Sequence, residues 1–70
     1  METVNVTSSQ IKTIKYNDIN KELIVTFNTD KTYKYEDVSM QLFRDLVSAD
    51  SVGKFFNENI KRSHKYSLIS

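Results

Sequence analysis

Residues 60–65 gather three cations and the only histidine of this 70-residue chain. The side chains concerned are Lys61, Arg62, His64 and Lys65. Lysine and arginine neutralise the phosphates of RNA or DNA, so this segment is a candidate nucleic-acid contact, with Lys34, Lys12 and Lys15 in support. The alternative is an ordinary solvated surface, which we favour because the net charge of the chain is only +1.

Tyr16, Tyr33 and Tyr35 are the second set of residues with chemical potential. Aromatic rings on a sheet, with lysines nearby, form the base-stacking platforms of some RNA-binding proteins. The same tyrosines, however, belong to an alternating apolar pattern with Leu23 and Val25. We therefore favour a role in the hydrophobic core, where this face of the sheet would be covered by helices.

Few residues could support catalysis or bind a metal ion. One histidine without cysteine falls short of a metal site, which combines several His, Cys or carboxylate ligands. Glu36 and Asp37 are adjacent in a strand and should point to opposite faces. Ser8, Ser9 and Ser51 have no evident base, and a strand entry and a helix cap explain them better. We predict no enzymatic activity and no cofactor.

Composition also bears on where the protein acts. No apolar run approaches the roughly 20 residues that span a membrane, and the first residues do not resemble a signal peptide. The lack of cysteine fits a reducing compartment. We expect a cytoplasmic protein with no membrane partner. Its richness in Lys, Asn and Ile indicates an AT-rich genome, such as that of a low-GC bacterium or its phage.

Alternating apolar residues predict three strands. Residues 14–16, 23–27 and 32–36 place aromatic and β-branched side chains two positions apart, which is typical of half-buried strands. Ile11 is out of step with this alternation by one residue. A β-bulge near residues 12–13 would return it to the core side.

The register of these strands follows from their faces, because directly opposite residues of an antiparallel pair share a face. The predicted partners are Tyr16 with Leu23, Ile14 with Val25, Val25 with Tyr33, and Leu23 with Tyr35. The connecting turns are then residues 18–21 and 28–30. Asp30 would end the second turn in the left-handed conformation, which aspartate tolerates at a cost.

Two helices follow the strands. Ser39 and Ser51 are the expected N-caps, and apolar residues recur at helical spacing over residues 42–49 and 52–60. Gly53, the only glycine, falls in the first turn of the second helix, where glycine costs about 1 kcal/mol relative to alanine. We attribute it to crowding against the neighbouring helix or a strand.

Phe56 and Asn57 follow one turn after that glycine. Phe56 should face the core. Asn57 is either a buried amide that hydrogen-bonds the backbone of a loop, which we favour, or an amide presented to a ligand.

Together these elements predict a single α+β domain over residues 1–70. Its architecture is a three-stranded antiparallel β-meander followed by two α-helices packed on one face. Residues 66–69 could add a short C-terminal edge strand.

The sequence also resembles the KTSC domain, a small family named for its occurrence at the C-terminus of some lysyl-tRNA synthetases and found in free-standing bacterial and phage proteins. The matching pieces are Val6-x-Ser8-Ser9-x-Ile11, Ile14-x-Tyr16, Leu23-x-Val25-x-Phe27, Tyr33-x-Tyr35-x-x-Val38, Ala49-x-Ser51-x-Gly53-x-x-Phe56-Asn57 and Ile60. Thr29-Asp30 and Ser39 depart from it, where the family typically has Asn-Gly and proline. The resemblance implies an α+β fold and supplies no catalytic residue.

The function expected from the sequence is that of a small non-catalytic interaction module, with an unidentified protein partner preferred over nucleic acid. The alternative is an RNA- or DNA-binding accessory domain that uses residues 61–65. The two differ in their response to salt, because phosphate binding weakens steeply as the salt concentration rises.

Overall fold

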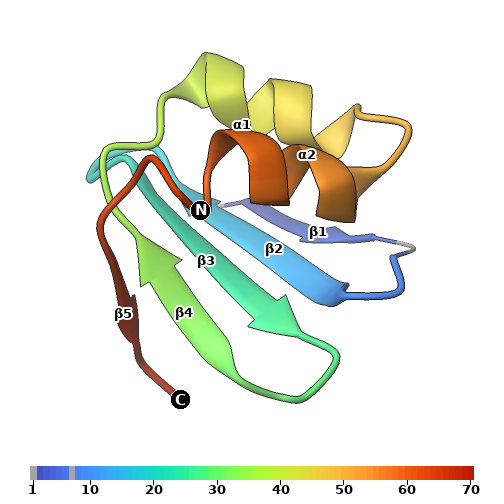
Figure 1. Ribbon diagram of the computed structural model, residues 1–70. Coiled ribbons are helices and arrows are strands. Elements are labelled where there is room, and N and C mark those ends of the chain that lie inside the picture. Colours follow the sequence, from blue (N-terminus) through green and yellow to red (C-terminus); the bar gives the residue numbers. More distant parts are fainter. Residues whose placement is uncertain (1, 7) are drawn as a thin grey trace.

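The computed structural model describes residues 2–6 and 8–70, with Glu2 described in its backbone only. A five-stranded antiparallel sheet, in the order β1-β2-β3-β4-β5, carries two helices on one face (Figure 1). The elements are β1 Glu2–Asn5, β2 Ile11–Asn17, β3 Glu22–Phe27, β4 Thr32–Tyr35, α1 Met40–Val47, α2 Val52–Asn59 and β5 Tyr66–Leu68. The predicted α+β class, meander and helix pair are present.

The predicted number of three strands was wrong. β1 pairs with β2 along its whole length, with Val4 opposite Ile14. Its sequence signal is only the pair Val4 and Val6, too short a pattern to stand out. β5 pairs with β4, so the tail does form the edge strand that residues 66–69 could supply.

Both hairpin registers are confirmed. Tyr16 lies opposite Leu23, and Leu23 lies opposite Tyr35. The register shifts between Ile11 and Thr13, where the bulge was expected, and Ile11 is fully buried as a result. Alternation of apolar residues was therefore sufficient to align the three central strands.

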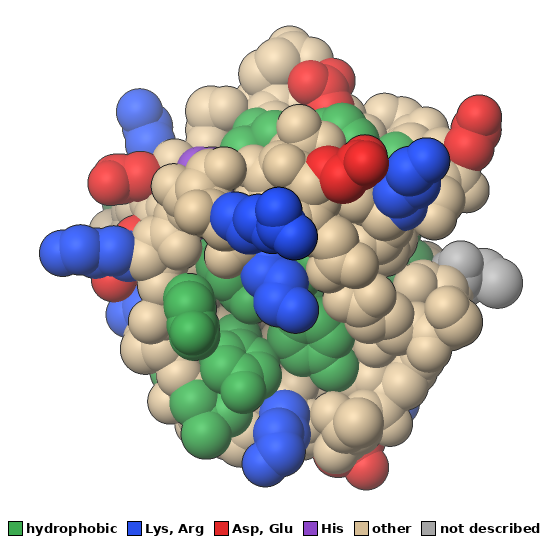
Figure 2. Space-filling model, viewed as in Figure 1, with side chains coloured by type: hydrophobic (Ala, Val, Ile, Leu, Met, Phe, Trp, Pro, Cys, Tyr) green, Lys and Arg blue, Asp and Glu red, His purple; other side chains and the backbone are tan. Residues whose placement is uncertain are grey.

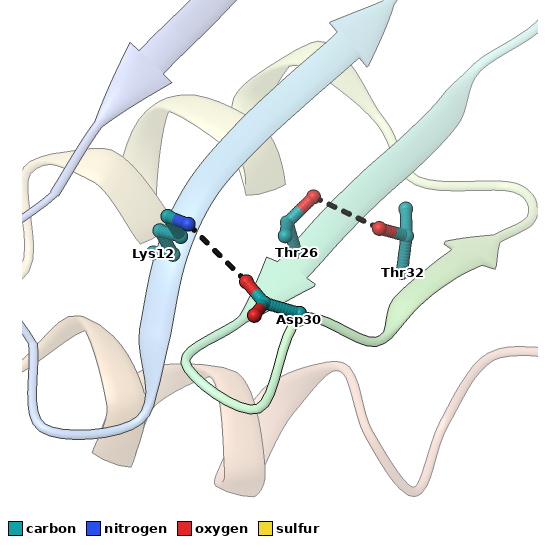
Figure 3. A network of polar contacts seen from close by, with 4 residues as sticks. All are labelled: Lys12, Thr26, Asp30 and Thr32. Carbon is teal, nitrogen blue, oxygen red and sulfur yellow. Dashed lines mark hydrogen bonds and ion pairs between the residues drawn. The ribbon is translucent and has the colours of Figure 1, made fainter. Parts of the chain in front are cut away.

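The turn between β3 and β4 takes its expected shape. Asp30 has a φ of 67°, in the left-handed region, and its N–H donates to the carbonyl of Phe27 at 2.9 Å. Its carboxylate lies 3.2 Å from the Lys12 ammonium, while the hydroxyls of Thr26 and Thr32 meet at 3.1 Å across the strands (Figure 3). The ion pair links the turn to β2, and the hydroxyl contact links β3 to β4.

Both predicted helix caps are confirmed. The Ser39 hydroxyl accepts from the backbone N–H of Leu42 at 3.1 Å, and the Ser51 hydroxyl accepts from that of Lys54 at 3.4 Å. Each serine therefore satisfies one N–H of a first turn that has no partner within its helix.

Aromatic rings fix the helices to the sheet. Tyr16 stacks on Phe43 of α1 with ring centroids 4.7 Å apart, and its hydroxyl donates to the buried carbonyl of Val38 at 2.6 Å. Phe56 of α2 is fully buried and meets the rings of Phe27 and Tyr35 edge-on. Packing of this kind adds about 0.5–1.5 kcal/mol per aromatic pair beyond the area buried.

Gly53 is buried against the segment that precedes β2. A Cβ atom at this position would lie 3.2 Å from the Ser8 hydroxyl and 3.5 Å from the Gln10 side-chain oxygen. The expected crowding is present, but its source is this loop rather than a helix or a strand. Ser8 can move little, because its hydroxyl also accepts from the backbone N–H groups of Gln10 and Ile11.

Neither helix within residues 2–6 and 8–70 has the length and apolar character that crossing a membrane requires.

Candidate functional site

The helices cover the apolar face of the sheet unevenly. Tyr16 on β2 and Tyr35 on β4 are buried, as the sequence predicted, but Tyr33 is only half-buried. Further toward the edge, Tyr66 and Leu68 of β5 lie opposite Tyr35 and Tyr33 and are 59% and 54% exposed. Burial therefore ends between β4 and β5, and part of this face is open to solvent.

The open part forms a groove of about 950 Å³ between the end of α2 and the sheet. Its lining includes four aromatic residues, Phe27, Tyr33, Tyr35 and Tyr66, and three cationic residues, Lys31, Lys61 and Arg62. We call this set the aromatic groove. Figure 2 shows hydrophobic side chains gathered below the helices, with Lys and Arg side chains above and below them.

The rings of the aromatic groove support one another. The ring centroid of Tyr66 lies 5.7 Å from that of Tyr35, with an angle of 33° between the ring planes. It lies 5.8 Å from the ring centroid of Tyr33, with an interplanar angle of 62°. Phe27 meets the other side of this cluster, edge-on to Tyr33 at 5.7 Å. Tyr66 thus rests on two neighbouring rings while more than half of its surface remains exposed.

Burial raises the pKa of Tyr35 to about 12, and the nearby phenols of Tyr33 and Tyr66 add to this shift. The phenol of Tyr35 is therefore neutral at physiological pH. It can donate a hydrogen bond there, but it is a poor general base.

The cations come from two turns. Lys61 and Arg62 follow α2, where the buried Ile60 and a 2.9 Å bond from the Lys61 N–H to the Phe56 carbonyl hold the backbone. Lys31 comes from the turn between β3 and β4. Among the described residues that line the groove there is no carboxylate, so the charged side chains of its lining are all cationic.

Asn57 and Gln10 are polar residues in the lining of the groove. Each side-chain amide donates to the other, at 3.0 and 3.2 Å. The partner of Asn57 is thus a side chain and not the loop backbone that the sequence favoured. Because this reciprocal pair links α2 to the segment before β2, it holds the helix beside the groove.

Only part of the basic segment reaches the groove. His64 and Lys65 are not in its lining, although His64 is half-buried and its Nδ1 has no hydrogen-bond partner among the described residues. Lys34 points to the opposite face of the sheet, where it lies 3.4 Å from Glu22. Alternation along β4 already required this, because Tyr33 and Tyr35 flank it.

The supporting lysines of β2 are also outside the lining. Lys12 pairs with Asp30 at the hairpin turn (Figure 3), and Lys15 is exposed elsewhere on the strand.

Sequence reasoning missed Lys31 and Tyr66, because a lone lysine in a turn and a tyrosine in a short tail carry no periodic signal. Within the described part of the chain no cluster of three His, Cys, Asp or Glu residues could hold a metal ion.

Comparisons with known proteins agree on one family. A family model described as the KTSC domain matches residues 7–66. The crystal structure of the KTSC domain protein YPO2434 from Yersinia pestis is similar, with a TM-score of 0.93 and 32% sequence identity. The similarity covers 99% of this chain and 97% of that one. No curated protein matches this sequence.

Proposed function

This chain belongs to the KTSC domain family, and for this member of it we propose a binding module whose anionic partner lies in the aromatic groove. The observation that carries the proposal is the composition of the groove. Three cations and four aromatic rings line it, and no carboxylate is among the described lining residues. The role proposed is binding without catalysis.

The charge of the groove determines what kind of partner fits. The chain as a whole has a net charge of +1, so a general attraction for polyanions is weak. Lys31, Lys61 and Arg62 instead concentrate positive charge beside an apolar surface. This arrangement favours a partner that combines negative charge with flat or apolar groups, over the purely apolar contacts that a neutral protein partner would use.

We expect charge reversal in the groove to weaken binding to heparin, a generic polyanion. The variant Lys61→Glu/Arg62→Glu removes two of the three cations from the groove. The matched control is Lys15→Glu/Lys54→Glu, which changes the net charge equally at exposed positions outside the lining. On a heparin column the groove variant should elute at a clearly lower salt concentration than the control variant.

The comparison between these two variants separates local from overall charge. Equal elution of both would mean that heparin responds only to net charge, and the groove would lose its proposed role. Circular dichroism of both variants checks that the fold is intact.

A further inference from the structure

The ring of Tyr66 is supported by neighbouring rings but remains largely exposed to solvent. It stands on the edge strand β5, supported by the rings of Tyr35 and Tyr33 at 5.7 and 5.8 Å, and is 59% exposed. A ring with this support loses little conformational freedom when a flat ligand stacks on it. Leu68, 54% exposed and opposite Tyr33 in the sheet, extends the apolar surface beside it.

Cations line the same groove. Lys61 and Arg62 are exposed and lie in the turn after α2, and both line the groove together with Tyr66. A partner must therefore offer a planar group to the ring and negative charge to the turn. An acidic peptide offers the charge without a regular supply of flat groups, and a nucleic-acid duplex has its base faces already stacked.

Single-stranded nucleic acid offers both groups in every nucleotide, since each base has an exposed face and each linkage a phosphate. Resting on the proposed function, we infer that the occupant of the aromatic groove is a single-stranded nucleic acid, with a base stacked on Tyr66 and phosphates bound by Lys61 and Arg62. Asn57 and Gln10 line the same groove, and each of their amides already bonds the other. Stacking on Tyr66 is tolerant of base sequence, because every base offers an aromatic face.

Salt dependence follows from the number of cations. For single strands the logarithm of the association constant falls by about 0.7 per neutralised phosphate for each unit of log salt. With Lys31, Lys61 and Arg62 engaged, the slope is about −2. In the Lys61→Glu/Arg62→Glu variant, which keeps one of the three cations, the association constant should depend much less on salt concentration.

The test is fluorescence anisotropy with three labelled octamers: dT8, rU8 and an abasic strand with the same phosphates. Base stacking predicts that dT8 or rU8 binds at least about tenfold more tightly than the abasic strand. Tyr66→Ala should weaken binding of the base-containing strands by about tenfold and leave the abasic strand unchanged. Tyr66→Phe keeps the ring and should bind as the natural protein does.

The outcomes distinguish this inference from the proposed function. Tighter binding of rU8 than dT8 assigns RNA, and the reverse assigns DNA; either supports the inference. An octaglutamate peptide serves as a further anionic probe. If the abasic strand or this peptide bound as tightly as dT8 and rU8, base stacking would be overturned, while an anion-binding groove would remain. Equal weakening of all strands by Tyr66→Ala would also overturn it. Failure of every anionic probe to bind at low salt would overturn both.

Discussion

Replacing Phe56 with alanine should lower the free energy of unfolding by about 3–5 kcal/mol, the cost of removing a large aromatic ring from a packed core. Phe56 is fully buried and packs edge-on against Phe27 and Tyr35, so its loss leaves a cavity between α2 and the sheet. A 70-residue domain has a stability of roughly 4–10 kcal/mol, at about 0.05–0.15 kcal/mol per residue. Urea denaturation of the Phe56→Ala variant should therefore show that most of the free energy of unfolding has been lost.

Phe55→Ala is the matched control, because it makes the same chemical change at the adjacent position. Phe55 is only partly buried beside the core, so its loss should cost clearly less. Similar losses in both variants, or a Phe56→Ala protein within about 1 kcal/mol of the natural one, would contradict this account of how α2 closes on the sheet.

Alkaline pH should unfold the domain through two buried phenols. Burial raises the pKa of Tyr16, with a smaller contribution from the charge of Asp18, and raises the pKa of Tyr35 to about 12. The neutral phenol is thus the favoured form in the folded state. This stabilisation is complete below the unfolded pKa of about 10 and is lost as the pH rises toward about 12.

Thermal unfolding between pH 9 and pH 12 checks this expectation. The melting temperature should fall steeply above pH 10, together with the rise in absorbance that marks ionised tyrosine. Tyr35→Phe removes one of the two titrating groups and should flatten the fall. An equally steep fall in Tyr35→Phe would show that Tyr35 is not a source of the pH dependence.

Local patterns in the sequence were enough for the central hairpins. Opposite residues share a face, so the alternation around Tyr16, Leu23 and Tyr35 left one workable register for each strand pair. The bulge and the left-handed Asp30 followed from the same constraint. β1 escaped detection because a four-residue edge strand with a single apolar residue owes its structure to pairing with β2.

The candidate site could not be predicted in the same way. Two of its cations, Lys61 and Arg62, stand out by their spacing, but their position beside Tyr66 depends on where α2 ends relative to β5. How far two short helices extend across a sheet is a matter of tertiary packing, which has no local sequence signal. The prediction that the tyrosine face is covered therefore held for Tyr16 and Tyr35 but not at the β5 edge.

Tyr16, Tyr33 and Tyr35, which the sequence offered as a possible base-stacking platform, differ in how far they are buried. Tyr16 is committed to the core by its stack on Phe43 and its bond to Val38. Tyr33 is shared between core and groove, and Tyr66 takes the exposed position instead. Of these rings, Tyr66 is the one that leaves more than half of its surface open at the edge of the sheet.

The most direct test of the central claim is to map the contact surface by ¹⁵N-labelled NMR while dT8 is added to the protein at low salt. We predict that the largest backbone shift changes cluster around Tyr33, Lys61, Arg62 and Tyr66, the residues that line the aromatic groove. Changes centred instead on Lys15 and Lys34, on the exposed side of the sheet, would contradict the claim that the groove is the binding site.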